Sequence, residues 1–216
     1  MSTPRSRAGA AVLGGKIFVV GGFDGDQDLS SVESFDPATG IWTAVAPMDT
    51  PRSCHGVVSA QGKLFAVGGF GEKDQGEYEF LKSVECFDPS TGVWTYINPM
   101  NEDRYQLGVA VLGDKLFAIG GLNHDVGEHS SVECLDLSVA NSAWRPVAPM
   151  TMPRSDFGVV VTGGKIYAIG GYLDARPSME SFDLNDGPLG RWTIVHSHFT
   201  AHFTTGACNH TSYVAV

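Results

Sequence analysis

The chain has 216 residues, of which 43% are hydrophobic and 18% are charged, so it can bury a core and is not disordered by composition. Its 14 basic and 24 acidic residues give a formal net charge of −10, which argues against a general binder of nucleic acid or anionic membranes, because both need a basic face. Its 27 glycines and 11 prolines, without a collagen period, predict many tight turns and therefore many short strands.

The N-terminal segment combines basic residues with an apolar stretch, so a secretory signal peptide has to be weighed. We reject it, because Lys16 interrupts the apolar stretch and the same pattern recurs inside the chain. No apolar run reaches the roughly 20 residues that span a bilayer. Four cysteines do not make a disulfide framework, and Cys86 and Cys134 occupy matching places of a repeated pattern. They suit a reducing compartment, and we expect a cytoplasmic protein.

A repeated pattern with a period near 50 residues dominates the chain. Each copy has an arginine, a glycine four residues later, and an apolar run that ends at a Gly-Gly doublet. A polar loop of variable length follows, then a glutamate, an aspartate and a tryptophan. The repeated residues are the arginines Arg5, Arg52, Arg104 and Arg154, the doublet glycines Gly21, Gly22, Gly68, Gly69, Gly120, Gly121, Gly170 and Gly171, and the tryptophans Trp42, Trp94, Trp144 and Trp192.

Each copy predicts four strands, as the second copy illustrates. A small-residue strand is predicted over 56–60, an apolar strand over 63–67, an alternating strand over 83–88 and a tryptophan-bearing strand over 93–97. The apolar second strand has no polar alternation, so we expect both of its faces to be buried. An Asp-Pro-x-Thr-Gly turn connects the third strand to the fourth in the first two copies. No segment has helical periodicity over ten residues.

Four-stranded sheets at this period are typical of β-propeller blades, so the predicted fold is all-β. The glycine doublets are expected beside the crowded propeller axis, where a side chain would collide. The tryptophans are expected to fill the widening gap between the outer parts of adjacent blades. The recurring arginine and glutamate are expected to pair within or between blades, because a buried charge needs a partner, in a structural role.

These motifs resemble the kelch repeat family over roughly residues 3–195, nearly the whole chain. The fullest copies, SVESFDPATGIWTAVAPM and SVECFDPSTGVWTYINPM, are most similar to the kelch domains of kelch-like BTB proteins. The resemblance implies a kelch-type propeller of usually about six blades, which binds partners on one face. Kelch-like BTB proteins are substrate adaptors of cullin-type ubiquitin ligases, and some related kelch proteins bind actin. We expect a protein-binding module of the adaptor kind, with actin binding as the alternative.

The chain departs from the family pattern in two ways. These 216 residues contain no BTB motif, so a cullin would be reached only through a domain absent here. Four and a fraction blades are expected not to close a ring, which leaves a fragment, a ring closed by a second chain, or a small closed ring. The four full repeats lie at about 3–48, 49–100, 101–150 and 151–195, and 196–216 is either the degenerate start of a fifth repeat or an unrelated tail.

Kelch adaptors contact ligands through the residue after each doublet and the two residues after each repeat arginine, and the resemblance carries these positions over. Aromatic and serine side chains at a propeller mouth suit a peptide ligand. Phe23 and Phe70 have packing between blades as the alternative, and Ser53 and Ser155 have a role in turns. The two sets are Phe23, Phe70, Leu122 and Tyr172, and Ser6, Arg7, Ser53, Cys54, Tyr105, Gln106, Ser155 and Asp156.

The loops after the doublets are acidic. Their net charges are −3 over residues 23–30, −2 over 70–82, −2 over 122–129 and zero over 172–178. We therefore expect a neutral or basic peptide ligand, because like charges would repel an acidic one. The alternative is a solvated acidic face without a binding role.

Other motifs point to chemistry only weakly. Residues 24–28 resemble the start of a calcium loop, but Phe35 stands where the bidentate glutamate is required. Three histidines have a strand spacing that suits a metal, but no cysteine or carboxylate lies near them in the sequence: His196, His198 and His202. We therefore expect no cofactor, no metal and no catalytic residue. A sugar-active kelch enzyme, an oxidase or a mutarotase, is the alternative from another class.

Overall fold

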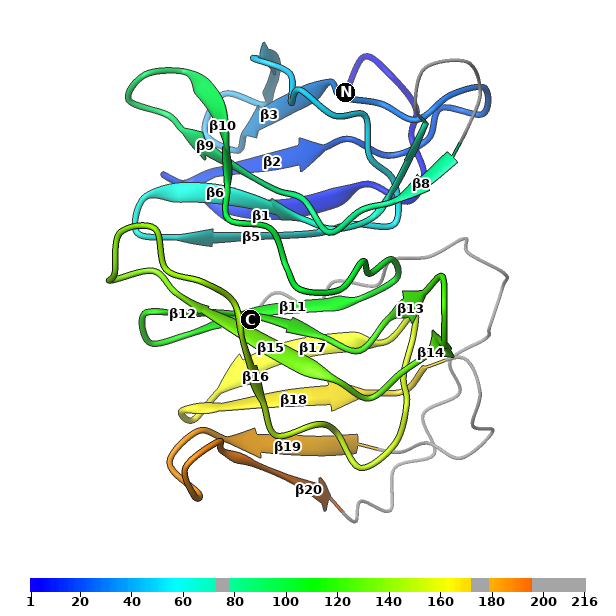
Figure 1. Cartoon of the computed structure of the whole chain (residues 1–216). Helices are drawn as coiled ribbons and strands as arrows, with labels where there is room; N and C mark the ends of the chain where they lie inside the picture. The colour runs from blue at the N-terminus through cyan, green and yellow to red at the C-terminus, as the bar shows by residue number, and fades with distance from the viewer. Residues whose placement is uncertain (73–77, 172–178, 196–216) are drawn as a thin grey trace. The chain divides into compact units, whose positions relative to one another are not determined.

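The computed structural model describes residues 1–72, 78–171 and 179–195. These residues form strands, turns and irregular connections, and they include no helix, so none of them forms a helix that could cross a membrane. The chain divides into two compact units, Met1–Tyr105 and Gln106–Val216. Each unit holds two four-stranded antiparallel sheets, which confirms the all-β prediction (Figure 1).

The first unit contains the first two repeats. One sheet consists of β1 (Gly9–Leu13), β2 (Lys16–Val20), β3 (Val32–Asp36) and β4 (Ile41–Val45) in that order. The other consists of β5 (Gly56–Ala60), β6 (Lys63–Val67), β9 (Val84–Asp88) and β10 (Val93–Ile97), also in chain order. A short hairpin, β7 (Phe70–Glu72) with β8 (Tyr78–Phe80), lies in the connection after the second glycine doublet.

The second unit repeats this plan. Its first sheet consists of β11 (Gly108–Leu112), β12 (Lys115–Ile119), β15 (Val132–Asp136) and β16 (Arg145–Val147). Its second sheet consists of β17 (Gly158–Thr162), β18 (Lys165–Ile169), β19 (Met179–Asp183) and β20 (Arg191–Val195). A two-residue hairpin, β13 (Leu122–Asn123) with β14 (Gly127–Glu128), follows the third doublet.

The turns between the third and fourth strands form as predicted where the Asp-Pro-x-Thr-Gly motif is present. In the second repeat, the Asp88 carboxylate accepts the backbone N–H of Ser90 at 2.9 Å, and the N–H of Gly92 donates to the Asp88 carbonyl at 2.8 Å. Gly92 has φ +71°, which a side chain rarely adopts. The third repeat lacks the motif, and there the fourth strand, β16, has only three residues.

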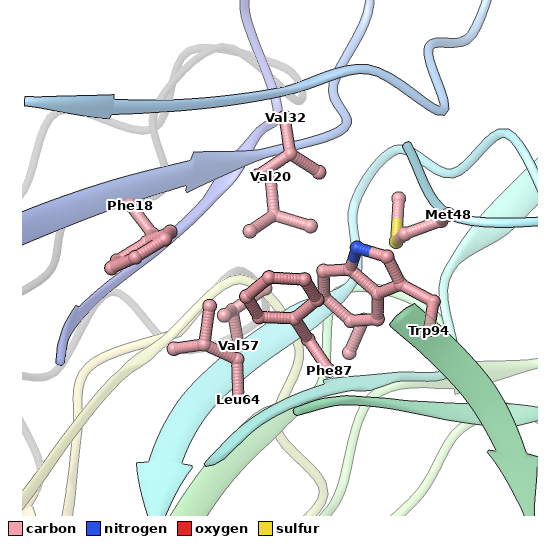
Figure 2. Packing of buried hydrophobic residues seen from close by; sticks show 9 residues of the cluster. Phe18, Val20, Val32, Met48, Val57, Leu64, Phe87 and Trp94 are labelled. Carbon is pink, nitrogen blue, oxygen red and sulfur yellow. The ribbon is translucent and has the colours of Figure 1, made fainter. Parts of the chain in front are cut away.

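Each unit has a core between its two sheets. In the first unit, Phe87 and Trp94 from the second sheet pack against Val20 and Val32 from the first (Figure 2). Trp94 is 5% exposed, and its indole N–H donates to the Ala46 carbonyl at 2.9 Å. The predicted filling of the space between blades by tryptophan is thus confirmed for Trp94, and Trp192 occupies the matching core position of the second unit. Trp144 is also buried, whereas Trp42 is only partly buried beside Phe35.

The predicted burial of both faces of the second strand holds for only part of the chain. In β6 and β12, four of the five residues are buried. In β2 and β18 the prediction is wrong, because only alternate residues are buried. The buried residues of these two strands belong to the core between the sheets of their own unit, and the opposite face is partly exposed.

The glycine doublets are explained by backbone conformation and by a close backbone neighbour. Gly21 and Gly22 have φ of +59° and +101° at the end of β2. The N–H of Gly22 donates to the carbonyl of Arg52, the arginine of the next repeat, at 2.7 Å. A Cβ on Gly21 would lie 2.5 Å from the same carbonyl oxygen. A side chain at Gly21 would therefore collide with the loop that carries the arginine of the next repeat, which we call the arginine loop. The left-handed backbone also favours glycine here.

In the first, second and fourth repeats, the recurring arginine and glutamate form a buried ion pair. Arg52 Nη2 lies 2.8 Å from Glu85 Oε1, and both side chains are fully buried. Arg52 also donates to the carbonyls of Gly68 and Ser83, and Glu85 accepts the N–H of Asp49. The pairs Arg5–Glu33 and Arg154–Glu180 repeat this arrangement. The arginine thereby fixes the loop before the first strand, which agrees with the predicted structural role.

Candidate functional site

The two predicted sets of contact residues meet at one end of each sheet of the first unit. Ser6 and Phe23 exchange two backbone hydrogen bonds of 2.9 and 2.8 Å. Ser53 and Phe70 exchange two backbone hydrogen bonds of 2.8 Å each. The residue after the arginine is thus joined to the residue after the doublet, although some 17 positions separate them in the sequence. We call this end of the sheets the rim.

The second residue after each repeat arginine has a left-handed backbone in all four repeats. The φ angles are +57° at Arg7, +52° at Cys54, +54° at Gln106 and +52° at Asp156. This conformation costs a non-glycine residue on the order of 1–2 kcal/mol. The N–H of Cys54 donates to the Arg7 carbonyl at 3.0 Å, and the N–H of Asp156 donates to the Gln106 carbonyl at 3.0 Å. Strained residues of successive repeats are therefore linked within each unit, which is typical of a functional surface.

The predicted residues of the first repeat lie at the surface. Ser6 is exposed, and Arg7 and Phe23 are partly buried. The guanidinium carbon of Arg7 lies 5.6 Å from the centre of the Phe23 ring, which is a cation–π contact.

The serines of the second and fourth repeats are placed differently. Ser53 and Ser155 are each only 1% exposed. The Ser155 hydroxyl donates to Glu128 Oε1 at 2.8 Å, and the Ser53 hydroxyl has no hydrogen-bond partner among the described residues. Both hydroxyls are covered in this structure, so Ser53 contributes its backbone rather than its side chain to the rim.

The other predicted positions divide between described and undescribed residues. Leu122 pairs with Glu128 in the β13–β14 hairpin, and Tyr105 and Gln106 are partly buried. Tyr172 lies outside the described residues.

Four aromatic rings gather at the rim of the second repeat. We call Phe70, Tyr78, Phe80 and Tyr105 the aromatic cluster. Phe70 stacks on Tyr78 with ring centres 4.9 Å apart, and Phe80 stacks on Tyr105 at 4.8 Å. The two stacks are joined by contacts of Phe70 with Phe80 at 5.5 Å and with Tyr105 at 6.3 Å.

Reasoning from the sequence found Phe70 and Tyr105 but missed the other two rings. Tyr78 and Phe80 lie on β8, in the longest of the loops that follow the doublets. Their alternation with Glu79 is the signal of a strand with one apolar face, and it would have predicted a hairpin here.

The acidic loop of the first repeat is held by its own backbone. The Asp24 carboxylate accepts the N–H groups of Asp26 and Gln27 at 2.9 Å each. The hydrogen bond from Gln27, and then that from Asp26, lower the pKa of Asp24 below its usual value. Asp24 and Asp26 are exposed, so this part of the rim carries negative charge at neutral pH. In the third repeat Glu128 is partly buried against Ser155.

The residues that the structure describes contain no group of three histidine, cysteine, aspartate or glutamate side chains placed to hold a metal ion. His196, His198 and His202 lie outside those residues. Cys86 and Cys134 are free thiols on the third strands of their sheets, and burial raises the pKa of both. They are strand residues, as predicted.

Comparison with known proteins places the chain among kelch proteins. The Kelch motif family model matches residues 4–49, 51–101, 103–151 and 153–194. Kelch-like protein 35 of Mus musculus is 30% identical over 142 residues, which cover 63% of this chain and 24% of that protein. Kelch-like protein 28 of Mus musculus is 38% identical over 96 residues (43% and 17%), and Kelch-like ECH-associated protein 1A of Danio rerio is 36% identical over 105 residues (49% and 17%).

The matched segments span about a quarter or less of the length of these three relatives. Among solved structures, that of YjhT is similar with a TM-score of 0.77 and covers 93% of this chain and 68% of its own. Its sequence identity of 17% supports the likeness of fold alone. Because the four motif matches cover most of the residues and coincide with four-stranded sheets, the chain belongs to the Kelch motif family and its sheets are blades of a kelch-type β-propeller.

Proposed function

We propose that this chain is a protein-recognition module, whose rim binds a peptide segment of another protein in the manner of the substrate-recognition propeller of a cullin-type ubiquitin ligase adaptor. The observation that carries the proposal is the joining of the arginine loops to the residues after the doublets. This joining holds partly exposed rings at the same end of the first two blades.

The chemistry of the rim suits a peptide better than a small polar substrate. Phe23, Phe70 and Tyr105 offer flat apolar area with few rotatable bonds, which is the usual anchor of a protein interface. Backbone groups held by paired hydrogen bonds form a rigid frame around these rings. A rigid frame lowers the entropy that is lost on binding. These features support a binding role without catalysis.

The charge of the rim favours a neutral or basic ligand. The exposed carboxylates of Asp24 and Asp26 lie in the loop that follows Phe23. The whole chain carries a formal charge of −10, so an acidic peptide would be repelled at low ionic strength.

Selection of peptides by the purified chain tests the binding role. Peptides chosen from a random displayed library should bind the chain and lose at least about tenfold in affinity on Phe23→Ser or Tyr105→Ser, because both substitutions remove a ring from the rim. The matched control is Tyr96→Ser, since Tyr96 is 53% exposed on β10 and lies outside the aromatic cluster. Peptides that bind both rim variants as tightly as the unchanged chain would overturn the proposal.

The adaptor role is separated from the actin alternative by the nature of the partner. Sedimentation with actin filaments that is lost on Tyr105→Ser would favour actin binding. An adaptor is expected to stay in the supernatant when the actin filaments are pelleted. Excess chain is also expected to slow the turnover of the adaptor's partner, since it competes with the complete adaptor for the same peptide.

A further inference from the structure

The hairpin that bears two rings of the aromatic cluster is anchored on its back face. In the β7–β8 register, Phe70 lies opposite Phe80 and Gly71 lies opposite Glu79. Residues alternate between the two faces of a hairpin, so Phe70, Tyr78 and Phe80 share one face. On the other face, a Cβ on Gly71 would lie 2.5 Å from the Pro51 carbonyl oxygen. The hairpin therefore lies directly on the arginine loop of its own repeat and presents its aromatic face away from that loop.

The cluster differs from the aromatic pairs that pack the core. Phe87 and Trp94 have ring centres 5.2 Å apart and are 4% and 5% exposed. In the cluster, Tyr78 is 62% exposed, and Phe70 and Tyr105 are partly exposed although their rings are stacked as closely. Stacked rings that keep this much accessible surface are suited to contact another molecule.

The first repeat shows which group fits an aromatic ring at this position. There the guanidinium of Arg7 lies over Phe23, the residue after the doublet. In the second repeat, Phe70 takes the place of Phe23, and Cys54 takes the place of Arg7 with the same left-handed backbone. Cys54 cannot supply a cation. Phe70 thus occupies the ring position that Arg7 covers in the first repeat.

The local charge also favours a cation. Glu102 and Asp103 precede Tyr105 closely in the sequence, whereas Glu79 lies opposite Gly71 on the other face of the hairpin. Arg104, the cation next to Tyr105, is buried and contacts Glu102 at 3.4 Å. A planar guanidinium stacks on tyrosine and phenylalanine faces and gains from nearby carboxylates, more so than the compact ammonium of lysine.

We propose that the aromatic cluster binds an arginine side chain of the peptide ligand, with the guanidinium stacked on the exposed ring of Tyr78 and its neighbours. This inference rests on the proposed function and specifies its ligand. It assigns recognition of one side chain to the hairpin of the second repeat, and it predicts that arginine is preferred over lysine and over any neutral side chain of the same shape.

Titration of the full chain with three hexapeptides tests the inference, with hexa-arginine, hexa-lysine and hexa-citrulline as probes. Citrulline keeps the size of arginine but is uncharged, so we expect the order arginine, lysine, citrulline in affinity. Tyr78→Leu should weaken hexa-arginine binding by about threefold to thirtyfold, whereas Tyr78→Phe keeps the ring and should change it by less than about twofold. Tyr96→Leu is the matched control, because it removes another exposed tyrosine of the same unit.

The outcomes separate this inference from the proposed function. Equal affinities for hexa-arginine and hexa-lysine would show that the charge of the probe alone determines binding. An unchanged affinity on Tyr78→Leu would show that the probe binds elsewhere than on Tyr78. Either result would overturn the inference. In that case library peptides that lack arginine and still lose binding on Tyr105→Ser would leave the proposed function standing. Library peptides whose affinity is unchanged by every rim substitution would overturn the proposed function itself. Because Tyr78 is largely exposed, Tyr78→Leu is expected to fold, and an unchanged melting temperature checks this.

Discussion

The imidazole of His55 is buried without the hydrogen bonds that such a group requires. The residue is 2% exposed, and neither ring nitrogen has a hydrogen-bond partner among the described residues. The carbonyl of Val20 lies nearby, outside hydrogen-bond geometry. Burial, and then the positive charge of Arg52, lower the pKa of His55 from 6.5 to about 3. The folded first unit therefore holds this side chain neutral over the whole range in which an unfolded histidine becomes charged.

The sign of the effect on stability follows from the two pKa values. Above about pH 6.5, His55 is neutral in both the folded and the unfolded chain, so its protonation does not lower the free energy of unfolding. As the pH falls toward 3, the unfolded chain binds a proton that the folded chain does not, and the free energy of unfolding decreases. Between pH 7 and pH 5 this loss amounts to about 2 kcal/mol.

Substitution of His55 by leucine, the residue at the matching position of the third repeat, should remove this loss. Urea denaturation at pH 7 and pH 5 should show the unchanged chain losing about 2 kcal/mol more than His55→Leu. The His55 ring proton signals in NMR should stay constant from pH 8 to pH 4. This measurement does not depend on two-state unfolding of the two units. A titration midpoint near pH 6.5, or equal losses in the His55→Leu and unchanged chains, would refute the reasoning.

Three further substitutions test the structural roles of repeat residues in the first unit. Arg52→Met should lower the free energy of unfolding in urea by about 3–5 kcal/mol, because it leaves Glu85 buried without its partner, and the double variant Arg52→Met/Glu85→Met should lose less. Equal losses in both variants would contradict a mutual ion pair. Gly21→Ala should lower the melting temperature more than Gly40→Ala, since both have positive φ but only Gly21 has a backbone atom in the path of the added Cβ; equal effects would leave conformation as the whole cause. Trp94→Ala should cost about 3–5 kcal/mol by removing the ring between the two sheets, and a loss below about 1 kcal/mol would place Trp94 outside the core.

The repeated copies made the fold predictable from the sequence. The strands expected over 56–60, 63–67 and 93–97 are β5, β6 and β10 with the same limits. This agreement has a physical cause, because the glycine doublet, the Asp-Pro-x-Thr-Gly turn and the buried tryptophan each impose one local geometry, and they recur in a fixed order. The burial of β2 and β18 could not be predicted in the same way, because the burial of a face depends on its neighbouring sheet and not on the strand alone.

The rim was predictable in its positions but not in its surface. Family resemblance placed Ser53 and Phe70 in one site, and the structure joins them by two hydrogen bonds. The burial of the Ser53 hydroxyl could not be foreseen, since the same position in the first repeat, Ser6, is exposed. The stacking of Phe70 on Tyr78 depends on a hairpin in a loop of variable length, where no repeated residue sets the register.

The left-handed residues show how one scaffold supports different recognition surfaces. Arg7, Cys54, Gln106 and Asp156 share a φ near +55° and have four different side chains. A conformation that these unlike side chains all adopt is not imposed by any of them. It is imposed by the loop, whose buried arginine and backbone hydrogen bonds to the neighbouring repeat hold the chain in place. The structural core of each blade therefore offsets the energetic cost of the strained backbone. The side chain at this position can then differ from repeat to repeat. Such a division lets the rim change its chemistry, from the guanidinium of Arg7 over Phe23 to the stacked rings of the second repeat, without altering the blade beneath.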